Sequence, residues 1–74
     1  MNPLATKVLT LSKPYFGPAA EQFLGRQCKT HLKVEFATLS QANLKDLAKW
    51  VELSGGLIMD QPKAAEIAKK IASL

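Results

Sequence analysis

The sequence predicts an all-α fold, a compact bundle or orthogonal array of four short helices. Apolar residues recur at the three- and four-residue spacing of a helix face in four segments, at about 3–12, 18–33, 40–54 and 62–74. The connectors between these segments are short, and several carry proline or glycine. Only Val34 to Phe36 alternates, and no second strand is available to pair with it. We therefore expect residues 1–74 to form a single helical domain.

The first helix is expected to open at Asn2 and Pro3, because proline is tolerated in the first turn of a helix. Its apolar face consists of Leu4, Val8 and Leu11. Pro14 disfavours helical geometry at Lys13, so the helix is predicted to stop near Ser12.

A corner with two aromatic residues, Tyr15 and Phe16, separates the first helix from the second. Two prolines and a glycine break regular structure there, and we expect the rings to anchor the corner to the core. The second helix is predicted from about Pro18 to about Lys33. Its apolar stripe consists of Ala20, Phe23, Leu24, Cys28 and Leu32. The connector that follows is expected to tuck Phe36 into the core.

The central helix has the clearest pattern in the chain. Its apolar stripe consists of Leu44, Leu47, Ala48 and Val51. Thr38 or Ser40 can cap its N-terminus, and Thr38 with Gln41 has the spacing of a capping box. Trp50 lies at the border of the stripe, where its ring can cover the seam to a neighbouring helix. Residues 55–56, both glycine, are expected to close the C-terminus in a left-handed conformation.

The last helix is predicted to begin at Asp60 or Gln61, with Pro62 in its first turn. Its apolar stripe consists of Ala64, Ile67, Ala68, Ile71 and Leu74. Glu66 and Lys70 have the order and spacing of a favourable ion pair on the solvent side.

Composition limits the classes of protein that the chain can belong to. Hydrophobic residues make up 47% of the sequence, which is typical of a globular fold. No apolar run is long enough to cross a bilayer, and the N-terminus lacks the pattern of a secretion signal. A single cysteine cannot form an internal disulfide, so a cytoplasmic location is the expected default. We expect no membrane association.

Residues that could support chemistry are few. Cys28 and His31 are three positions apart on the second helix, but a zinc site needs three or four ligands and no other Cys or His exists. No glycine elbow or cysteine-protease signature accompanies either residue. We therefore expect no catalytic residue, no metal, no cofactor and no small-molecule substrate, with Cys28 acting as an apolar core residue.

The stretch from Lys13 to Gln27, KPYFGPAAEQFLGRQ, resembles a small GPxA-type accessory helical domain of bacterial signalling proteins, often found next to serine/threonine kinases. The resemblance rests on the corner at residues 15–18 followed by Ala20. The later segments LSQANLKDLAKWV and AAEIAKKIASL fit the same plan of short amphipathic helices. The resemblance implies a non-catalytic accessory role in signalling, and it supplies no catalytic residues.

The leading functional hypothesis is a non-enzymatic interaction or regulatory domain that binds a protein partner through an apolar groove or associates with itself. Large apolar side chains are unusually frequent in the predicted connectors and at helix borders. The candidates for a partner-binding surface are Phe16, Phe36, Trp50, Leu57 and Met59. For each of these residues, burial in the core is the competing explanation.

The alternative hypothesis is a small basic module that binds nucleic acid. Ten Lys and Arg against six Asp and Glu give a formal net charge of +4, which favours acidic partners. The candidate contacts on the last two helices are Lys45, Lys49, Lys63, Lys69 and Lys70. Acidic residues lie among them, and the chain has a single arginine, the side chain that most often reads bases.

Overall fold

The computed structural model describes residues 2–74, and within that range it contains helices and no strand. The α-helices are α1 (Pro3–Phe16), α2 (Ala20–Gln27), α3 (Leu44–Gly55) and α4 (Gln61–Ala72). Shorter helical segments, η1 (Gly17–Ala19), η2 (Cys28–Leu32), η3 (Phe36–Thr38) and η4 (Gln41–Asn43), join them. The predicted all-α fold of four helices is confirmed.

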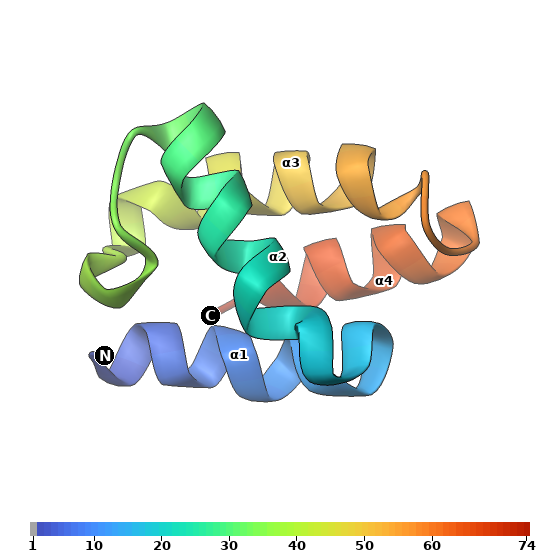
Figure 1. The fold of residues 1–74 in the computed structure, drawn as a ribbon, viewed down its shortest axis with the longest axis horizontal. Helices are drawn as coiled ribbons and strands as arrows, with labels where there is room; N and C mark the ends of the chain where they lie inside the picture. The colour runs from blue at the N-terminus through green and yellow to red at the C-terminus, as the bar shows by residue number, and fades with distance from the viewer. Residues whose placement is uncertain (1) are drawn as a thin grey trace.

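The four helices enclose one core in a globule of 28 × 21 × 20 Å (Figure 1). The helices α3 and α4 form an antiparallel hairpin, and α1 packs beside α4. The helix α2 crosses obliquely over the other three and contacts both α1 and α3. The C-terminal end of α1 lies close to the C-terminal end of α3, since Phe16 is beside Gly55.

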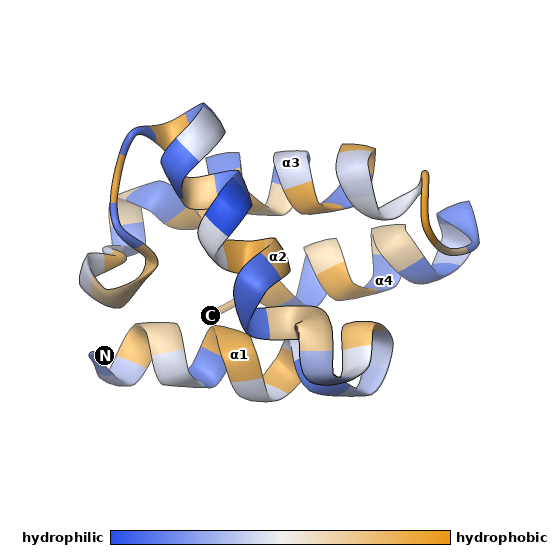
Figure 2. Ribbon diagram, in the orientation of Figure 1, coloured by the Kyte–Doolittle hydropathy of each residue, from blue (hydrophilic) through white to orange (hydrophobic). Residues whose placement is uncertain are grey.

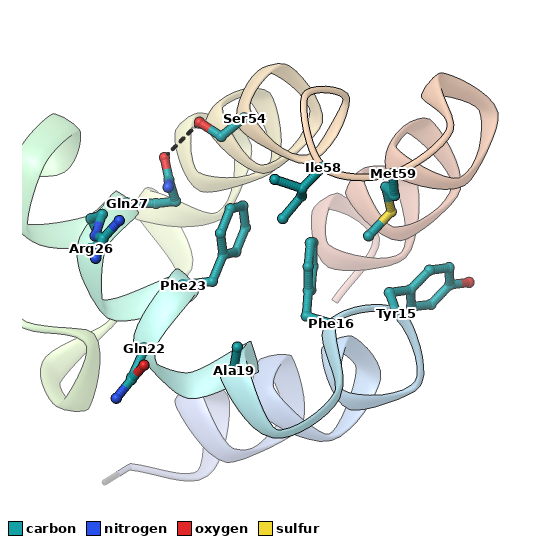
Figure 3. Close-up of a pocket in the computed structure, with 10 residues that line it drawn as sticks. All are labelled: Tyr15, Phe16, Ala19, Gln22, Phe23, Arg26, Gln27, Ser54, Ile58 and Met59. Atoms are coloured by element: carbon teal, nitrogen blue, oxygen red, sulfur yellow. Dashed lines mark hydrogen bonds between the residues drawn. The ribbon is translucent and has the colours of Figure 1, made fainter.

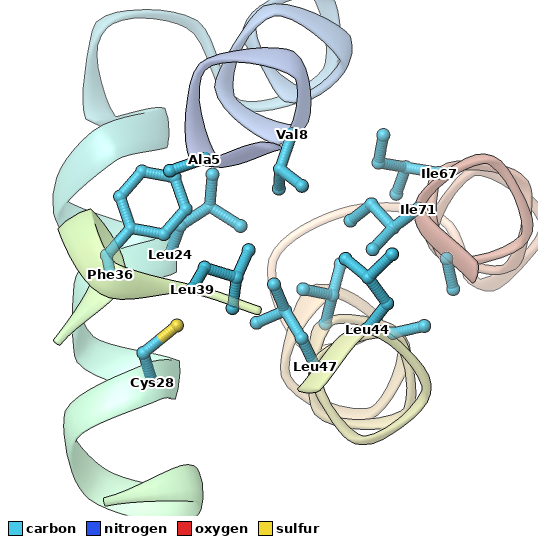
Figure 4. Packing of buried hydrophobic residues seen from close by; sticks show 13 residues of the cluster. Ala5, Val8, Leu24, Cys28, Phe36, Leu39, Leu44, Leu47, Ile67 and Ile71 are labelled. Atoms are coloured by element: carbon cyan, nitrogen blue, oxygen red, sulfur yellow. The ribbon is translucent and has the colours of Figure 1, made fainter. Parts of the chain in front are cut away.

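The core contains the predicted stripe of α3 and most of that of α4. In α1 the buried positions are Ala5, Val8 and Ser12, and the predicted Leu4 and Leu11 are only partly buried. In Figure 4 side chains from α1, α2, α3 and α4 meet in one cluster, with η3 and the following residue closing one side. The largest fully buried apolar side chains are Leu24, Leu39, Leu44, Leu47, Ile67, Ile71, Val8 and Val51. The hydrophobic faces of the helices, coloured orange in Figure 2, turn toward this core.

The first helix is longer than the sequence predicts. It runs through Pro14 and ends at Phe16, and Gly17 closes it by donating its N–H to the carbonyl of Lys13. The predicted stop near Ser12 is therefore wrong. The last turn is held by its aromatic side chains: Phe16 stacks on Phe23, and Tyr15 hydrogen-bonds with two residues of α4. These contacts offset the hydrogen bond that a proline removes.

The second helical stretch changes its winding along its length. It begins with the 3₁₀ turn η1, continues as α2 and ends in the π-helical segment η2. Lys33 then adopts a left-handed conformation at φ 60° and terminates the stretch, as the predicted boundary at about Lys33 requires. The next segment contains η3 rather than a strand, and Phe36 is buried there as expected.

Of the two predicted N-caps of the central helix, Ser40 is confirmed, because it caps η4, which leads directly into α3. Asn43 Oδ1 accepts hydrogen bonds from both the backbone N–H and the hydroxyl of Ser40, at 3.0 and 2.9 Å. Thr38 instead donates its hydroxyl to the carbonyl of Glu35, and Gln41 donates to the carbonyl of Leu74. The proposed pairing of Thr38 with Gln41 is therefore wrong, whereas Ser40 does lie at the start of the element.

The predicted left-handed cap at residues 55–56 is also wrong. Gly56 has φ −64°, and Gly17 is the glycine with a positive φ among the described residues. Gly55 is buried, and a Cβ placed on it would lie 3.4 Å from Ala64 Cβ and 3.6 Å from the ring of Phe16. Gly55 thus lies where α3 packs against α4 and the end of α1, with room for a Cβ at ordinary contact distance.

The last helix begins as predicted, with Asp60 at its N-cap and Pro62 in its first turn. No helix within residues 2–74 has the length and hydropathy needed to cross a membrane.

Candidate groove between α1, α2 and α3

A groove of about 520 Å³ lies where the C-terminal end of α1 meets α2 and the connector that follows α3. The helix α1 contributes Tyr15 and Phe16, and the connector contributes Ile58 and Met59. The other lining residues come from η1, α2 and the end of α3: Ala19, Gln22, Phe23, Arg26, Gln27 and Ser54. The groove thus joins three segments that are far apart in the sequence.

Aromatic and aliphatic side chains form the floor of the groove (Figure 3). The rings of Phe16 and Phe23 stack with their centroids 4.3 Å apart and their planes inclined at 23°. Ile58 and Met59 lie above these rings in Figure 3, and Ile58 is 65% exposed. An exposed β-branched residue beside two aromatic rings gives the groove an apolar surface that water can reach.

Polar side chains form one edge of the groove. Gln27 is 95% buried, since only 5% of its surface is exposed, and its Oε1 accepts a hydrogen bond from the Ser54 hydroxyl at 3.0 Å. This bond connects α2 with α3 across the groove (Figure 3). Arg26 is exposed beside Gln27 and carries the positive charge of this edge.

A second hollow of about 430 Å³ adjoins the first, because Tyr15 and Met59 line both. It is also lined by residues of α1 and α4: Thr10, Leu11, Pro14, Lys63, Glu66 and Lys70. The two hollows together make one groove along the end of α1, which we call the α1 groove.

The far end of the α1 groove carries a polar cluster of one tyrosine, one lysine and one glutamate. Tyr15 Oη donates a hydrogen bond to Glu66 Oε2 and accepts one from Lys70 Nζ at 2.8 Å. The predicted pair of Glu66 and Lys70 is present, with nitrogen and oxygen 3.9 Å apart. The hydrogen bond that Lys70 donates to Tyr15 raises the pKa of Lys70 above its ordinary value.

The candidate partner-binding residues occupy different environments. Phe16 and Met59 line the groove, and Leu57 is 87% exposed next to it. Phe36 is buried in the core with only 7% of its surface exposed, so its assignment to a binding surface is corrected. Trp50 is partly buried, and its ring stacks on that of His31 at 3.8 Å, covering the seam between α3 and η2 as expected.

The candidate lysines are all exposed, but they do not share one site. Lys63 and Lys70 line the α1 groove. Lys49 lies on α3 with its Nζ 5.6 Å from the centre of the Trp50 ring, close to η2. Lys45 and Lys69 line neither hollow. The basic residues are thus divided between the groove and other surfaces.

Cys28 and His31 do not converge. Cys28 is fully buried, and burial raises the pKa of its thiol to about 11. His31 is exposed and stacks on Trp50. Within residues 2–74 no group of three or more His, Cys, Asp or Glu side chains is placed to hold a metal ion.

Sequence reasoning missed several residues of the groove. Phe23 was assigned to the core stripe of the second helix, although it is only partly buried and faces Phe16. Ile58 lies between two residues that were identified, and its position in an apolar connector could have indicated it. Gln27 and Ser54 carried no local signal, because their pairing joins positions 27 residues apart.

Comparison of the chain with protein-family models, with curated proteins and with solved structures finds no significant match.

Proposed function

We propose that this protein is a non-enzymatic interaction or regulatory domain that binds a protein partner, or a second copy of itself, in the α1 groove. The observation that supports this proposal most directly is the apolar floor formed by Phe16, Phe23 and Ile58, together with the exposed Leu57 beside it. A small domain gains stability by burying such side chains, so leaving them at the surface is costly unless a partner covers them.

The rigidity of the groove also supports an interaction role. The end of α1 is tied to α2 by the stacked rings and to α4 by the Tyr15 hydrogen bonds. The Gln27 to Ser54 bond ties α2 to α3. A preformed surface loses little conformational entropy when it binds, which favours affinity.

The corner at residues 15–18 resembles accessory domains of bacterial signalling proteins, and this resemblance agrees with the proposal. Two residues of the corner, Tyr15 and Phe16, line the groove. We extend the proposal to a cytoplasmic signalling setting, in which a free buried thiol such as Cys28 is stable.

Sedimentation equilibrium tests the self-associating form of the proposal. If a second copy fills the groove, the mass of the wild-type protein rises with concentration, and Ile58→Asn returns it to that of a monomer. Ile58 is 65% exposed, so this change is expected to leave the fold intact, which circular dichroism checks. A monomer at all concentrations contradicts self-association and leaves a foreign partner as the occupant.

Nucleic-acid binding is the second candidate function, and one specific observation favours it. The candidate lysines Lys45, Lys49, Lys63 and Lys69 are exposed, and within residues 2–74 the ion pair found is that of Lys70 with Glu66. A nucleic-acid binder loses affinity steeply as salt rises, because phosphate contacts release counterions. An oligonucleotide tests this candidate. If its affinity falls as salt rises and Ile58→Asn does not change that affinity, the exposed lysines rather than the groove form the functional site.

A further inference from the structure

The α1 groove offers hydrogen-bond donors and positive charge at both ends of an apolar floor. Arg26 lies at the end near α2, and Lys63 and Lys70 lie at the end near α4. The acidic residue that lines the groove is Glu66, and its carboxylate is already engaged by Tyr15 and Lys70. The groove therefore carries three positive charges against one negative charge.

The buried amide of Gln27 adds a neutral donor to this set. Its Oε1 is taken by the Ser54 hydroxyl, and within residues 2–74 no hydrogen bond is found for its Nε2. The side chain is 95% buried, and it lines the groove. Its Nε2 is not buried without a partner, so it is placed at the groove to donate a hydrogen bond to an acceptor on a bound segment.

From this arrangement we propose that the α1 groove binds an acidic amphipathic segment, with apolar side chains over Phe16, Phe23 and Ile58 and carboxylates at both ends. This inference rests on the proposed function and names the chemistry of its partner. Charge complementarity selects the segment: carboxylates pair with Arg26 and Lys63, whereas a basic segment meets like charge at both ends. The net charge of +4 disfavours a second copy of this chain as the source of the acidic segment, so the inference concerns the foreign-partner form of the proposed function.

Fluorescence anisotropy with designed peptides tests the proposal on the full chain. Three labelled amphipathic helical peptides share one leucine stripe and differ only in their flanking residues, which are glutamate, glutamine or lysine. The glutamate peptide is expected to bind about tenfold or more tightly than the lysine peptide, with the glutamine peptide between them. Its affinity is expected to fall as salt is raised, because the rim charges are exposed.

Two matched pairs of variants locate the binding. Lys63→Glu reverses a charge at the groove, and Lys45→Glu reverses a charge that lines neither hollow. Ile58→Asn makes the floor polar, and Leu53→Asn makes the same type of change at an exposed residue of α3 that lines neither hollow. The glutamate peptide is expected to bind about fivefold or more weakly to the first member of each pair and nearly normally to the second.

The outcomes separate this inference from the proposed function. Equal binding of all three peptides, lost in Ile58→Asn, overturns the acidic partner and leaves the groove as a protein-binding site. Tight binding of the glutamate peptide that Ile58→Asn and Lys63→Glu do not weaken overturns the assignment to this groove. Failure of all three peptides to bind overturns the inference, and the sedimentation experiment then tests separately whether a second copy of the chain occupies the groove.

Discussion

Ser12 on α1 is fully buried, and within residues 2–74 it is the buried polar side chain whose oxygen lacks a hydrogen-bond partner. A buried hydroxyl without a partner carries the desolvation cost of a polar group, and serine is a poorer helix former than alanine. We expect Ser12→Ala to raise the free energy of unfolding by about 1 kcal/mol. Urea denaturation measures this change. A loss of stability would show that the hydroxyl makes a bond of its own.

Cys28 is a second residue whose environment sets its chemistry. Burial raises the pKa of the Cys28 thiol from 9.0 to about 11. Between these pH values the thiol stays protonated in the native protein, whereas it ionises in the unfolded chain. We expect iodoacetamide to leave Cys28 unmodified in the native state at neutral pH and to alkylate it in urea, which mass spectrometry detects. Rapid alkylation of the native protein would contradict this.

The same pKa shift predicts how stability depends on pH. The thiol pKa of Cys28 is higher in the folded protein than in the unfolded chain, so ionisation of the thiol favours the unfolded chain. The resulting contribution to stability is fully present below pH 9 and is lost as the pH rises through about 11. Urea denaturation of Cys28→Ala and wild type over this window is expected to show a flatter fall in stability for the variant, because alanine has no thiol to ionise in the unfolded chain.

At the scale of the elements, the glycines Gly17 and Gly25 form a natural comparison. A Cβ on either would meet no atom within 4 Å, so packing does not distinguish them. Gly17 has φ 65° and ψ −145°, a conformation that residues with a Cβ rarely adopt, whereas Gly25 lies within α2. We expect Gly17→Ala to cost about 1–3 kcal/mol of unfolding free energy. Gly25→Ala should instead stabilise by about 0.5–1 kcal/mol, and thermal unfolding of both variants measures the contrast.

Gly55 tests which role a glycine has at the end of α3. Its φ is not left-handed, and a Cβ would rest at ordinary contact distance from Ala64 and Phe16. We expect Gly55→Ala to change the unfolding free energy by less than about 1 kcal/mol, in either direction. Gly55→Val should lose about 1–3 kcal/mol because its extra methyl groups crowd α4 and the end of α1. A large loss in Gly55→Ala would restore the left-handed cap that the sequence predicts.

The elements show which rules of sequence interpretation hold and which fail. Helical spacing identified the buried stripe of α3 correctly, because every stripe position from Leu44 to Val51 lies in the core. Local rules failed at Pro14 and Gly55. A proline normally ends a helix and paired glycines normally cap one, but here contacts from distant segments prevail: Tyr15 and Phe16 hold the last turn of α1, and Ala64 approaches Gly55.

At the scale of the whole molecule, the groove lay largely beyond sequence reasoning. Phe16 and Met59 could be identified because large apolar residues in connectors are unusual. Phe23 and Gln27 could not be identified, because whether they line a groove depends on how α2 crosses the other helices. Phe36 lies in a connector with a similar apolar pattern, but η3 packs against α1 and Phe36 joins the core.

Asn2 joins two regions that are 37 positions apart in the chain. Its Oδ1 accepts the Ala5 N–H at 2.7 Å, and its Nδ2 donates to the carbonyl of Leu39 at 2.7 Å. Its own N–H donates to the carbonyl of Ala37. The first turn of α1 and the segment around η3 should therefore open as one cooperative unit on the timescale of amide hydrogen exchange. In Asn2→Ala, exchange should accelerate at both Ala5 and Leu39; acceleration at Ala5 alone would mean that the two ends of this clamp fluctuate independently.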